Sequence, residues 1–341
     1  MRCLWAGLYH GLAGGESLVV PVSVLWYIAR NFDRHESGRA MGGSAVSQTI
    51  GMIGLGLMGT AMSRNLLAAG FAVAGYDVRP EAMQALADAG GRPAASSAEV
   101  GKRADVVITA LPSGAIVEAA LLGPEGVAEG ARPGLLILEM STVAPETSRR
   151  LAARLGDRGV PMLDAPVSGT SSMVARRDCI IMVGGDRAAF DRCGPILEAL
   201  SRRAFYIGPS GAGAQLKLVT NLIMGVNTLA TAEGLALGVK AGLEPRLMLE
   251  VLGQSAAASR MLELRGPLMV DRQYEAQMKI EMFLKDISLI LENGQQLKMP
   301  LPLAAAMQQM FTAAYNQGRG AQEMAAVIEA YRRAGGAPEV P

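Results

Sequence analysis

The spacing of apolar residues changes near residue 209, and this change predicts two kinds of structure. Before it, apolar runs at residues 49–53, 71–76, 104–110, 135–139, 161–167, 179–183 and 205–207 indicate buried strands, most of them separated by helical segments. After it, residues 212–241 form one long helical pattern, and the remainder is helical with no strand pattern. We therefore predict an α/β fold: an N-terminal Rossmann doubly wound sheet, then an all-α C-terminal domain on a long interdomain helix.

The same pattern divides the chain into three parts. We expect residues 1–48 to be an extension, residues 49–210 to form the doubly wound domain, and residues 211–341 to form a helical domain. The extension's apolar run, residues 18–29, is shorter than the roughly 20 residues that span a bilayer. Glu16 and several glycines precede this run, whereas a signal peptide has a compact basic start. We interpret the extension as disordered or as a start codon assigned too early, with Met41 as the alternative start.

The stretch TIGMIGLGLMGTAMSRNLLAAG predicts a strand, a glycine turn and a helix. The turn carries Gly54, Gly56 and Gly59 in the spacing G-x-G-x-x-G. The first glycine allows a tight turn, the second lets the backbone approach a pyrophosphate, and the third lets the helix pack closely on the strand. The helix N-terminus offers free N–H groups to an anion. Because a strand precedes the motif and a helix follows it, we predict a dinucleotide site instead of a plain tight turn.

The end of the second predicted strand bears on which dinucleotide binds. Asp77 follows this strand at the distance from the glycines where an acidic residue accepts hydrogen bonds from the ribose hydroxyls. Such a carboxylate favours NAD and repels a 2'-phosphate. Arg79 is the opposing signal, because an arginine there can stack on adenine or tolerate NADP. We predict NAD as the cofactor, with NADP as the alternative.

Composition excludes several classes of function. The chain has 32 basic and 31 acidic residues and a net charge of +1, so no basic field attracts nucleic acid or a membrane, and we expect a small-molecule partner. Cys3, Cys179 and Cys193 lack C-x-x-C spacing, which argues against structural zinc or disulfides and favours the cytoplasm. His10 and His35 both precede residue 49. We therefore expect no imidazole base, no Ser/His/Asp triad and no metal in the main body.

The long helix supplies the candidate acid–base group. Lys217 and Asn221 are four residues apart, hence on one face, among apolar neighbours. Burial lowers a lysine pKa from about 10.4 toward the working range, so a neutral amine can take a hydroxyl proton and an ammonium can return it. The alternative is a lysine that snorkels at a helix start. Apolar residues on more than one side of this helix predict a homodimer or homotetramer.

From residue 49 to about residue 335, the chain resembles the β-hydroxyacid dehydrogenases, which include 3-hydroxyisobutyrate dehydrogenase and 2-hydroxy-3-oxopropionate reductase. GLGLMG at residues 54–59 looks like the family's cofactor turn, and ALP at 110–112 and MST at 140–142 look like its nicotinamide-side loops. DAPVSG at 164–169 looks like the substrate signature, and FLKD at 283–286 like a later motif whose lysine closes onto the cofactor. Residues 211–221 match the catalytic helix of a C-terminal domain similar to that of 6-phosphogluconate dehydrogenase.

This resemblance implies the function and the site residues. Residues 49–210 are then an NAD(P)-binding Rossmann domain, and residues 211–341 a helical domain for substrate binding and dimerisation. It implies an NAD(P)-dependent oxidoreductase that transfers a hydride between nicotinamide and a small β-hydroxyacid or semialdehyde, of the 3-hydroxyisobutyrate or tartronate semialdehyde type. Lys217 is then the proton-transfer residue, Asn221 orients the substrate, and Ser168 and Gly169 hold its carboxylate. The implied cofactor-binding residues are Gly54, Leu55, Gly56, Leu57, Met58, Gly59, Asp77, Arg79, Leu111, Pro112, Thr142 and Lys285.

The chain also departs from the family pattern. A second glycine usually follows DAPVSG, whereas Thr170, Ser171 and Ser172 stand here, and we expect Thr170 to reshape the substrate site. Thr220 and Glu323 replace an asparagine and an aspartate that are common in the family. Two alternatives stay open: an imine reductase-like enzyme on the same scaffold, and a non-catalytic nucleotide-binding protein. An intact set of lysine, amide and serine favours the dehydrogenase over both.

Overall fold

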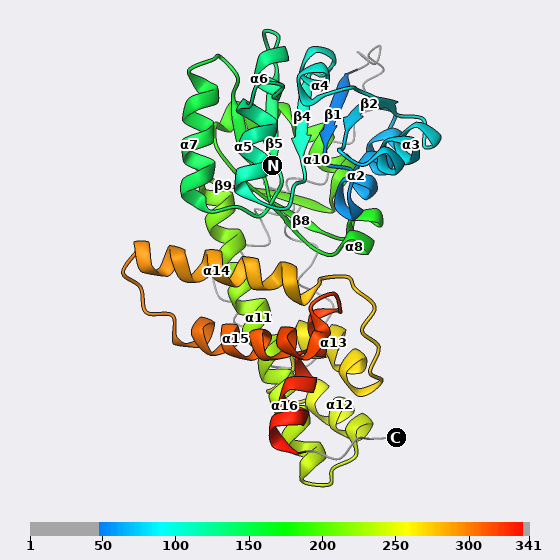
Figure 1. Ribbon diagram of the computed structural model, residues 1–341, viewed down its shortest axis with the longest axis vertical. Helices are drawn as coiled ribbons and strands as arrows, with labels where there is room; N and C mark the ends of the chain where they lie inside the picture. Colours follow the sequence, from blue (N-terminus) through cyan, green and yellow to red (C-terminus); the bar gives the residue numbers. More distant parts are fainter. Residues whose placement is uncertain (1–47, 337–341) are drawn as a thin grey trace, which may run out of the picture. The chain divides into compact units, whose positions relative to one another are not determined.

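The computed structural model describes residues 48–336, which contain a nine-stranded sheet and, after it, a set of helices. Figure 1 shows the strands gathered among helices α2 to α10, and the helices from α11 onward without strands between them. The predictions made for residues 1–47, including the extension, its start at Met41 and both histidines, lie outside the described residues. The mixed α/β fold and the helical C-terminal part are confirmed.

The sheet has the strand order β3-β2-β1-β4-β5-β6-β8-β7, and β9 pairs with β8. The first six strands are parallel, and their order is the doubly wound order in which the chain reverses direction across the sheet between β1 and β4. Strand β8 runs antiparallel to β6 and β7 and parallel to β9. The strands are β1 (Thr49–Ile53), β2 (Ala72–Tyr76), β3 (Arg92–Pro93), β4 (Val106–Thr109), β5 (Leu136–Glu139), β6 (Met162–Asp164), β7 (Val167–Ser168), β8 (Ile180–Gly184) and β9 (Arg203–Gly208).

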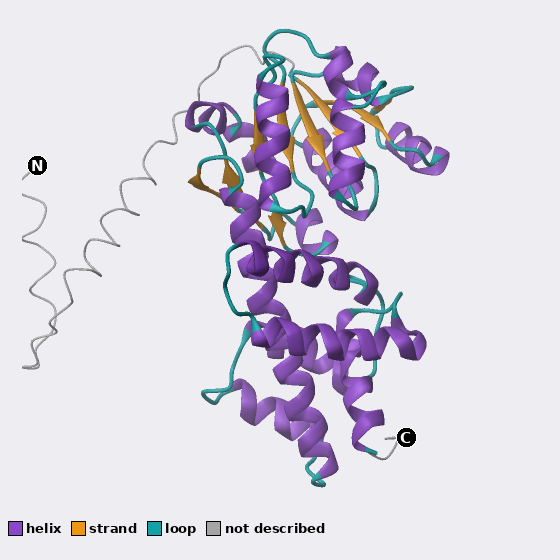
Figure 2. Cartoon of the chain, turned by 60° about the vertical axis from the view of Figure 1, so that its left-hand side comes forward, coloured by secondary structure: helices purple, strands orange, loops and turns teal. Residues whose placement is uncertain are grey.

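Helices cover the sheet and then form the second part of the structure; Figure 2 separates them from the strands by colour. The helices of the first part are α2 (Leu57–Ala68), α3 (Pro80–Asp88), α4 (Ser97–Arg103), α5 (Gly114–Leu122), α6 (Val127–Gly130), α7 (Pro145–Gly156), α8 (Ser171–Ala175), α9 (Arg187–Arg192) and α10 (Gly194–Leu200). Those of the second part are α11 (Ala212–Lys240), α12 (Pro245–Gly253), α13 (Arg260–Val270), α14 (Ile280–Gln296), α15 (Pro302–Ala314), the π-helix η1 (Tyr315–Arg319), the 3-10 helix η2 (Met324–Val327) and α16 (Ile328–Gly335).

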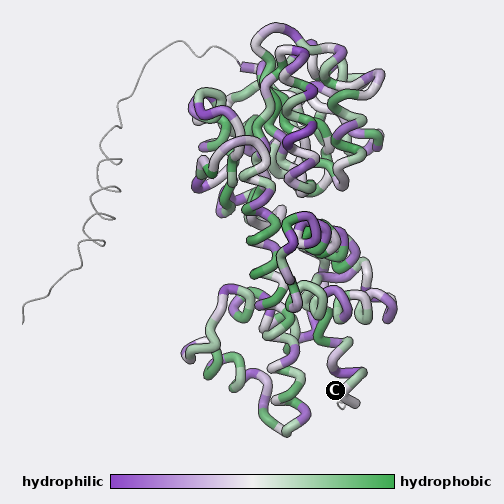
Figure 3. Tube along the Cα trace, turned by 90° about the vertical axis from the view of Figure 1, so that its left-hand side faces the viewer, coloured by the Kyte–Doolittle hydropathy of each residue, from purple (hydrophilic) through white to green (hydrophobic). Residues whose placement is uncertain are grey.

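Both faces of the sheet are buried, which explains why its strands are continuous apolar runs. Side chains alternate along a strand, so Leu136 and Leu138 of β5 pack in one apolar cluster with Leu66 of α2. Ile137, between them, packs on the other face in a cluster with Leu151 of α7. In Figure 3 the hydrophobic colour is concentrated on the inside of the part that contains the sheet, and many hydrophilic segments lie on its outside.

Two details of the strand prediction were wrong. Residues 161–167 do not form one strand: β6 ends at Asp164, and β7 begins at Val167. Pro166 lies in the gap and has no backbone N–H, so the ladder is interrupted there. The prediction also omitted β3, a two-residue edge strand containing Pro93, which is too short to produce an apolar run.

The helical part packs around α11. Phe283 of α14 and Phe311 of α15 meet edge to face, with ring centroids 5.0 Å apart, inside an apolar cluster that includes Leu229 of α11. Within residues 48–336, α11 is the one helix long and apolar enough to cross a bilayer, with 39% of its apolar window buried. The central helix of a globular protein passes the same test, so these properties do not indicate a membrane.

Candidate functional site

A cavity of about 1050 Å³ lies at the carboxyl ends of the parallel strands and is bordered by α11 and α14. This is the place where a doubly wound sheet binds its ligands, and the volume is at the upper end of the usual range for ligand sites. Four of the predicted site residues do not line the cavity, namely Leu55, Gly59, Ser168 and Asn221. The cavity brings together Gly54, Gly56, Leu57, Met58, Asp77, Arg79, Leu111, Pro112, Thr142, Gly169, Thr170, Lys217 and Lys285.

Each glycine of the turn between β1 and α2 has a different geometric need. Gly54 has φ +89°, and a Cβ there would lie 2.5 Å from the Ala110 carbonyl oxygen. A Cβ at Gly59 would lie 1.9 Å from the Gly54 carbonyl oxygen, so only glycine lets α2 approach the strand. At Gly56, which lines the cavity, a Cβ would meet no protein atom within 4 Å. The open side of this turn therefore fits a phosphate group at the N-terminus of α2.

Asp77 is already hydrogen-bonded by its own chain. Its carboxylate accepts the Leu55 N–H at 2.7 Å and the Arg79 N–H at 3.0 Å. The Arg79 guanidinium adds Nε at 3.0 Å and Nη2 at 3.1 Å. Burial opposes ionisation, but these hydrogen bonds outweigh it and hold the pKa of Asp77 below its usual value. A carboxylate has about four acceptor positions, so a ribose hydroxyl must displace the half-exposed Arg79 side chain.

Lys217 has the environment of an acid–base group. Its side chain is 7% exposed, reaches the cavity from the second turn of α11, and makes no hydrogen bond within the part of the chain that the structure describes. Burial lowers the pKa of Lys217; nearby Asp286 opposes this shift and Lys285 adds to it. The ammonium is therefore easier to deprotonate than that of a lysine in water.

A polar network surrounds this lysine. Asp286 of α14 is buried and accepts the Asn221 amide Nδ2 at 2.8 Å. Lys285 Nζ lies 3.0 Å from Asp286 Oδ1 and donates to the Thr142 carbonyl at 2.9 Å. The network thus joins α11, α14 and the turn after β5. Asn221 donates its amide N–H to Asp286 and does not line the cavity. Its role as a substrate-orienting amide stays a prediction.

Sequence reasoning missed the residue that fixes the start of α11. Asp164 is buried at the end of β6, and its carboxylate accepts the Gly211 N–H at 2.7 Å and the Ala214 N–H at 2.8 Å. Burial raises the pKa of Asp164, and these backbone N–H groups counteract the shift. The sequence contained a signal for this role: Asp164 is the first residue of the DAPVSG stretch, and the N-terminus of a helix attracts a carboxylate.

Ser168, Gly169 and Thr170 form the turn between β7 and α8. Gly169 has φ +153°, and a Cβ there would lie 2.8 Å from the Cys179 Cβ. The Thr170 hydroxyl accepts the Met173 N–H at the start of α8 and lies 2.8 Å from the Ser172 hydroxyl. Thr170 and Ser171 line the cavity, whereas Ser172 is exposed outside it. The departure from the family pattern therefore adds two hydroxyl-bearing residues to the cavity wall.

The segment before α14, residues 276–279, forms another part of the wall. Buried Glu323 holds it by accepting the Gln277 N–H at 3.2 Å and the Met278 N–H at 2.7 Å, and it pairs with Arg265 Nε at 3.0 Å. Its carboxylate reaches two backbone N–H groups and an arginine, which explains why an acidic residue is suitable at this position.

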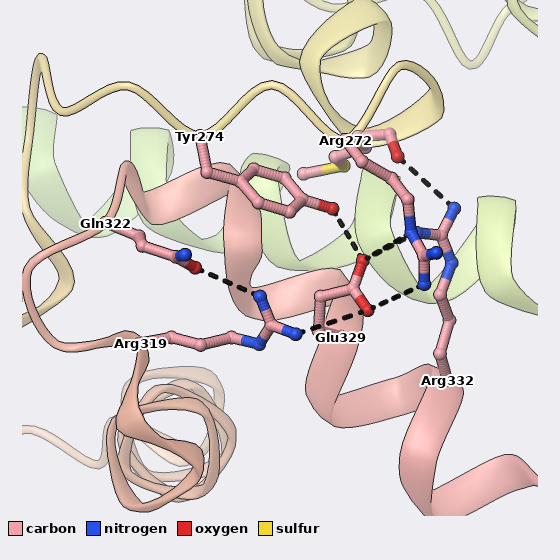
Figure 4. Close-up of polar contacts among 7 residues, drawn as sticks. Arg272, Tyr274, Arg319, Gln322, Glu329 and Arg332 are labelled. Atoms are coloured by element: carbon pink, nitrogen blue, oxygen red, sulfur yellow. Dashed lines mark hydrogen bonds and ion pairs between the residues drawn. The ribbon is translucent and has the colours of Figure 1, made fainter. Parts of the chain in front are cut away.

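A second carboxylate, Glu329 of α16, fixes the chain just before this wall. Figure 4 shows groups from three segments converging on it. The shortest contacts come from the Tyr274 hydroxyl and Arg332 Nη1, both at 2.7 Å. The remaining contacts come from Arg272 Nη2 at 3.3 Å and Arg319 Nη2 at 3.6 Å. These ion pairs connect the loop after α13 to η1 and α16.

Within residues 48–336, no group of three or more His, Cys, Asp or Glu side chains has an arrangement that would hold a metal ion. The polar groups facing the cavity suit a dinucleotide instead. The open glycine turn fits a pyrophosphate, Asp77 and Arg79 lie where the adenosine ribose of a Rossmann ligand lies, and Lys217 lies on the opposite side of the strand-order reversal.

Comparison with known proteins gives matches over nearly the whole described chain. Residues 49–208 match the NAD binding domain of 6-phosphogluconate dehydrogenase, and residues 211–331 match the family described as NAD-binding of NADP-dependent 3-hydroxyisobutyrate dehydrogenase. An L-threonate dehydrogenase from Cupriavidus necator is 39% identical over 287 residues, which cover 84% of this chain and 97% of that protein.

Two further matches agree with these. A 3-hydroxyisobutyrate dehydrogenase from Pseudomonas aeruginosa is 36% identical over 270 residues, which cover 77% of this chain and 91% of that protein. The crystal structure of a 3-hydroxyisobutyrate dehydrogenase from Salmonella typhimurium superposes with a TM-score of 0.76 at 34% identity, covering 83% of this chain and 99% of that one.

Proposed function

Because this chain belongs to the β-hydroxyacid dehydrogenase family, we propose that it is an NAD(P)-dependent dehydrogenase of a small hydroxycarboxylate, with Lys217 as its acid–base residue. One observation carries the proposal: a buried lysine with a lowered pKa faces the same cavity as an open glycine turn. The family matches favour this function over the imine reductase and the non-catalytic alternatives.

The residues of the chain supply the proton chemistry. A bound nicotinamide supplies the carbon that accepts the hydride from the carbon bearing the hydroxyl group. Lys217, as the neutral amine, takes the hydroxyl proton onto Nζ while the carbon–oxygen double bond forms; in the reverse direction its ammonium returns that proton. Lys285 and Asp286 hold α14 against the turn after β5, and the Lys217 side chain near them is 7% exposed.

The proposed substrate is a small acid with hydroxyl groups. Ser168 and Gly169 are proposed to bind its carboxylate; of these two, Gly169 lines the cavity, and Thr170 offers a hydroxyl in the same wall. L-threonate and 3-hydroxyisobutyrate are the first compounds to test, because relatives at 39% and 36% identity are dehydrogenases of these acids. The hydroxyl-bearing residues after Gly169 support the more hydroxylated of the two.

The cofactor, the assembly and the compartment complete the proposal. The Asp77 carboxylate supports NAD over NADP, and Arg79 would have to leave Asp77 to bind a 2'-phosphate.

Exposed apolar side chains in the helical part, such as Ile223 at 56% and Leu303 at 62% exposure, support a homodimer or homotetramer. The cysteines in the described range, Cys179 and Cys193, are buried free thiols, which supports the reducing cytoplasm.

Absorbance at 340 nm tests the function directly. The purified chain is assayed in both directions with NAD(H) and NADP(H) against L-threonate, 3-hydroxyisobutyrate, L-serine, tartronate semialdehyde and a cyclic imine. We expect turnover of a hydroxyacid and a lower KM for NAD than for NADP. Reduction of the imine alone would favour the imine reductase, and nucleotide binding without turnover of any compound would favour a non-catalytic protein.

A further inference from the structure

Two buried carboxyl groups lie directly behind the cavity, in one row across the sheet. Thr109 at the end of β4 is in register with Glu139 at the end of β5, and Glu139 is in register with Asp164 at the end of β6. Glu139 has no exposed surface, and Asp164 is 1% exposed. Carboxyl groups are rarely buried so completely unless hydrogen bonds hold them, so the groups that each one binds indicate its role.

Glu139 joins two turns that line the cavity. Its Oε1 accepts the Ser141 N–H at 2.8 Å. The Ser141 hydroxyl oxygen accepts the Leu111 N–H at 2.9 Å. Ser141, which Glu139 fixes, therefore holds the turn after β4 to the turn after β5, alongside the backbone hydrogen bond from the Met140 N–H to the Thr109 carbonyl at 3.0 Å.

Asp164, its neighbour in the row, holds the helix that carries Lys217. Its two oxygens bind the Gly211 and Ala214 N–H groups at the start of α11. The row thus connects both sides of the reaction centre: Glu139 fixes the turns of residues 111–112 and 140–142, and Asp164 fixes Lys217.

We propose that Glu139 is a positioning residue that holds these two turns against the nicotinamide half of the cofactor and thereby sets the affinity for that half. Glu139 itself does not line the cavity, so it acts through Ser141 and Leu111, which do. The inference rests on the proposed function, because it requires a nicotinamide cofactor in this cavity. The adenosine half lies at the glycine turn and Asp77, on the other side of the strand-order reversal, and does not depend on Glu139.

The protonation state of Glu139 gives the role a measurable signature. Burial raises the pKa of Glu139 to about 7, hydrogen bonds from Ser141 oppose the shift, and the charge of Asp164 adds to it. Asp164 on β6 is the charged group facing Glu139; Thr109 on β4 and Ser141 are neutral. Its Oε2 has no hydrogen-bond partner in the described structure. An ionised carboxylate accepts hydrogen bonds more strongly than a neutral acid, so the turns are held more firmly above pH 7 than below it.

Binding of two ligands, one with and one without nicotinamide, tests this role. NADH is titrated by fluorescence and ADP-ribose by calorimetry, at pH 6 and pH 8, with the wild-type chain and with Glu139→Gln, Ser141→Ala and Thr109→Val. In the wild type we expect NADH, but not ADP-ribose, to bind more tightly at pH 8. Glu139→Gln should weaken NADH about 10-fold at pH 8, leave ADP-ribose unchanged, and abolish the pH dependence.

The other two variants separate positioning from general stability. Ser141→Ala should also weaken NADH binding selectively, because it removes the hydroxyl that accepts the Leu111 N–H. Thr109→Val should change little, because the Thr109 hydroxyl contacts Glu139 only at 3.4 Å. If Glu139→Gln does not fold, the wild-type chain decides the question: an affinity for NADH that is the same at pH 6 and pH 8 would refute the role of Glu139.

Two results would overturn the role of Glu139. Equal weakening of both ligands means that the residue only supports the fold, and an unchanged, still pH-dependent affinity for NADH means that it does not hold the turns. A wild-type chain that binds neither ligand would refute the proposed function, and the positioning role with it. Wild-type binding of both ligands, followed by one of the first two results, refutes the positioning role alone.

Discussion

Lys217 differs from the other lysines of the chain because the fold removes it from water without giving its charge a hydrogen bond. The chain has no histidine after residue 49, and burial lowers the pKa of this lysine, so Lys217 is the candidate acid–base group. Asp286 of α14 raises the pKa of Lys217, which lies on α11. Asn221, on the same face of α11 as Lys217, donates a hydrogen bond to Asp286 and so joins the two helices beside the lysine.

Replacing Lys217 tests its assignment. We expect Lys217→Ala to lower kcat by about 100-fold or more, the usual contribution of a general acid–base residue, while the Kd for NADH stays within about twofold. Steady-state kinetics and fluorescence titration measure the two quantities. Lys240→Ala, at the exposed end of the same helix, is the control and should keep wild-type kinetics. Near-normal turnover of Lys217→Ala would exclude the residue as the acid–base group.

The charge of Asp286 should set the pH range of the reaction. Asp286 raises the pKa of Lys217 against the lowering caused by burial, so Asp286→Asn should lower that pKa further. Oxidation needs the neutral amine, and its rate rises with pH through the lysine pKa; the rise in kcat/KM should therefore move to lower pH in the variant. Glu281→Gln, which changes another carboxylate of the cavity wall, should leave the profile in place. A shift to higher pH in Asp286→Asn would contradict the assignment.

At the scale of elements, the start of α11 decides where the site residues lie. Gly211, which precedes the first residue of α11, has φ +87°, and the N–H groups of Gly211 and Ala214 reach the carboxylate of Asp164. A Cβ at Gly213 would lie 2.4 Å from the Met182 carbonyl oxygen, so the helix approaches β8 more closely than an alanine allows. Lys217, one turn later, is placed by this close contact.

Two glycines of α11 give a matched prediction about stability. Gly213→Ala should destabilise the protein by about 1–3 kcal/mol, because the backbone of β6 and β8 must move. Gly234→Ala, where a Cβ meets no atom within 4 Å, should stabilise it by up to about 1 kcal/mol through helix propensity. Thermal and urea denaturation measure both free energies of unfolding. Equal effects of the two substitutions would show that the start of α11 is not closely packed.

For the whole molecule, the exposed apolar side chains of the helical part require an explanation. Leu297, Met299 and Leu303 lie within seven residues of chain at the connection of α14 and α15, and each is at least 60% exposed. Such a cluster is unusual on a monomer surface and is typical of an interface.

We therefore expect light scattering of the purified chain to give a multiple of 35.6 kDa. Leu303→Glu should shift the assembly toward the monomer, because it places a charge in the proposed interface. Gln84→Glu, on exposed α3 of the Rossmann part, is the control and should leave the mass unchanged. A wild-type chain that is monomeric at micromolar concentration would refute the proposed assembly.

Much of the architecture could be predicted because it is encoded locally. Strand β1, the glycine turn and α2 were recognisable from an apolar run and three glycines whose spacing has a geometric reason. The partner of Asn221 could not be predicted, because Asp286 is 65 residues away in the chain. The break in the strand of residues 161–167 was missed because the apolar run is continuous, although the ladder is not.

The sequence by itself determined the fold class, the cofactor turn and the family resemblance, because each depends on residues that are neighbours in the chain or on one helix face. Only the tertiary structure decided that Asp164 holds the start of α11, that Arg79 covers Asp77, and that Glu139 joins two turns of the cavity. These contacts arise where the ends of separate parallel strands meet, and burial there gives carboxyl groups and lysines properties that a residue type alone does not reveal.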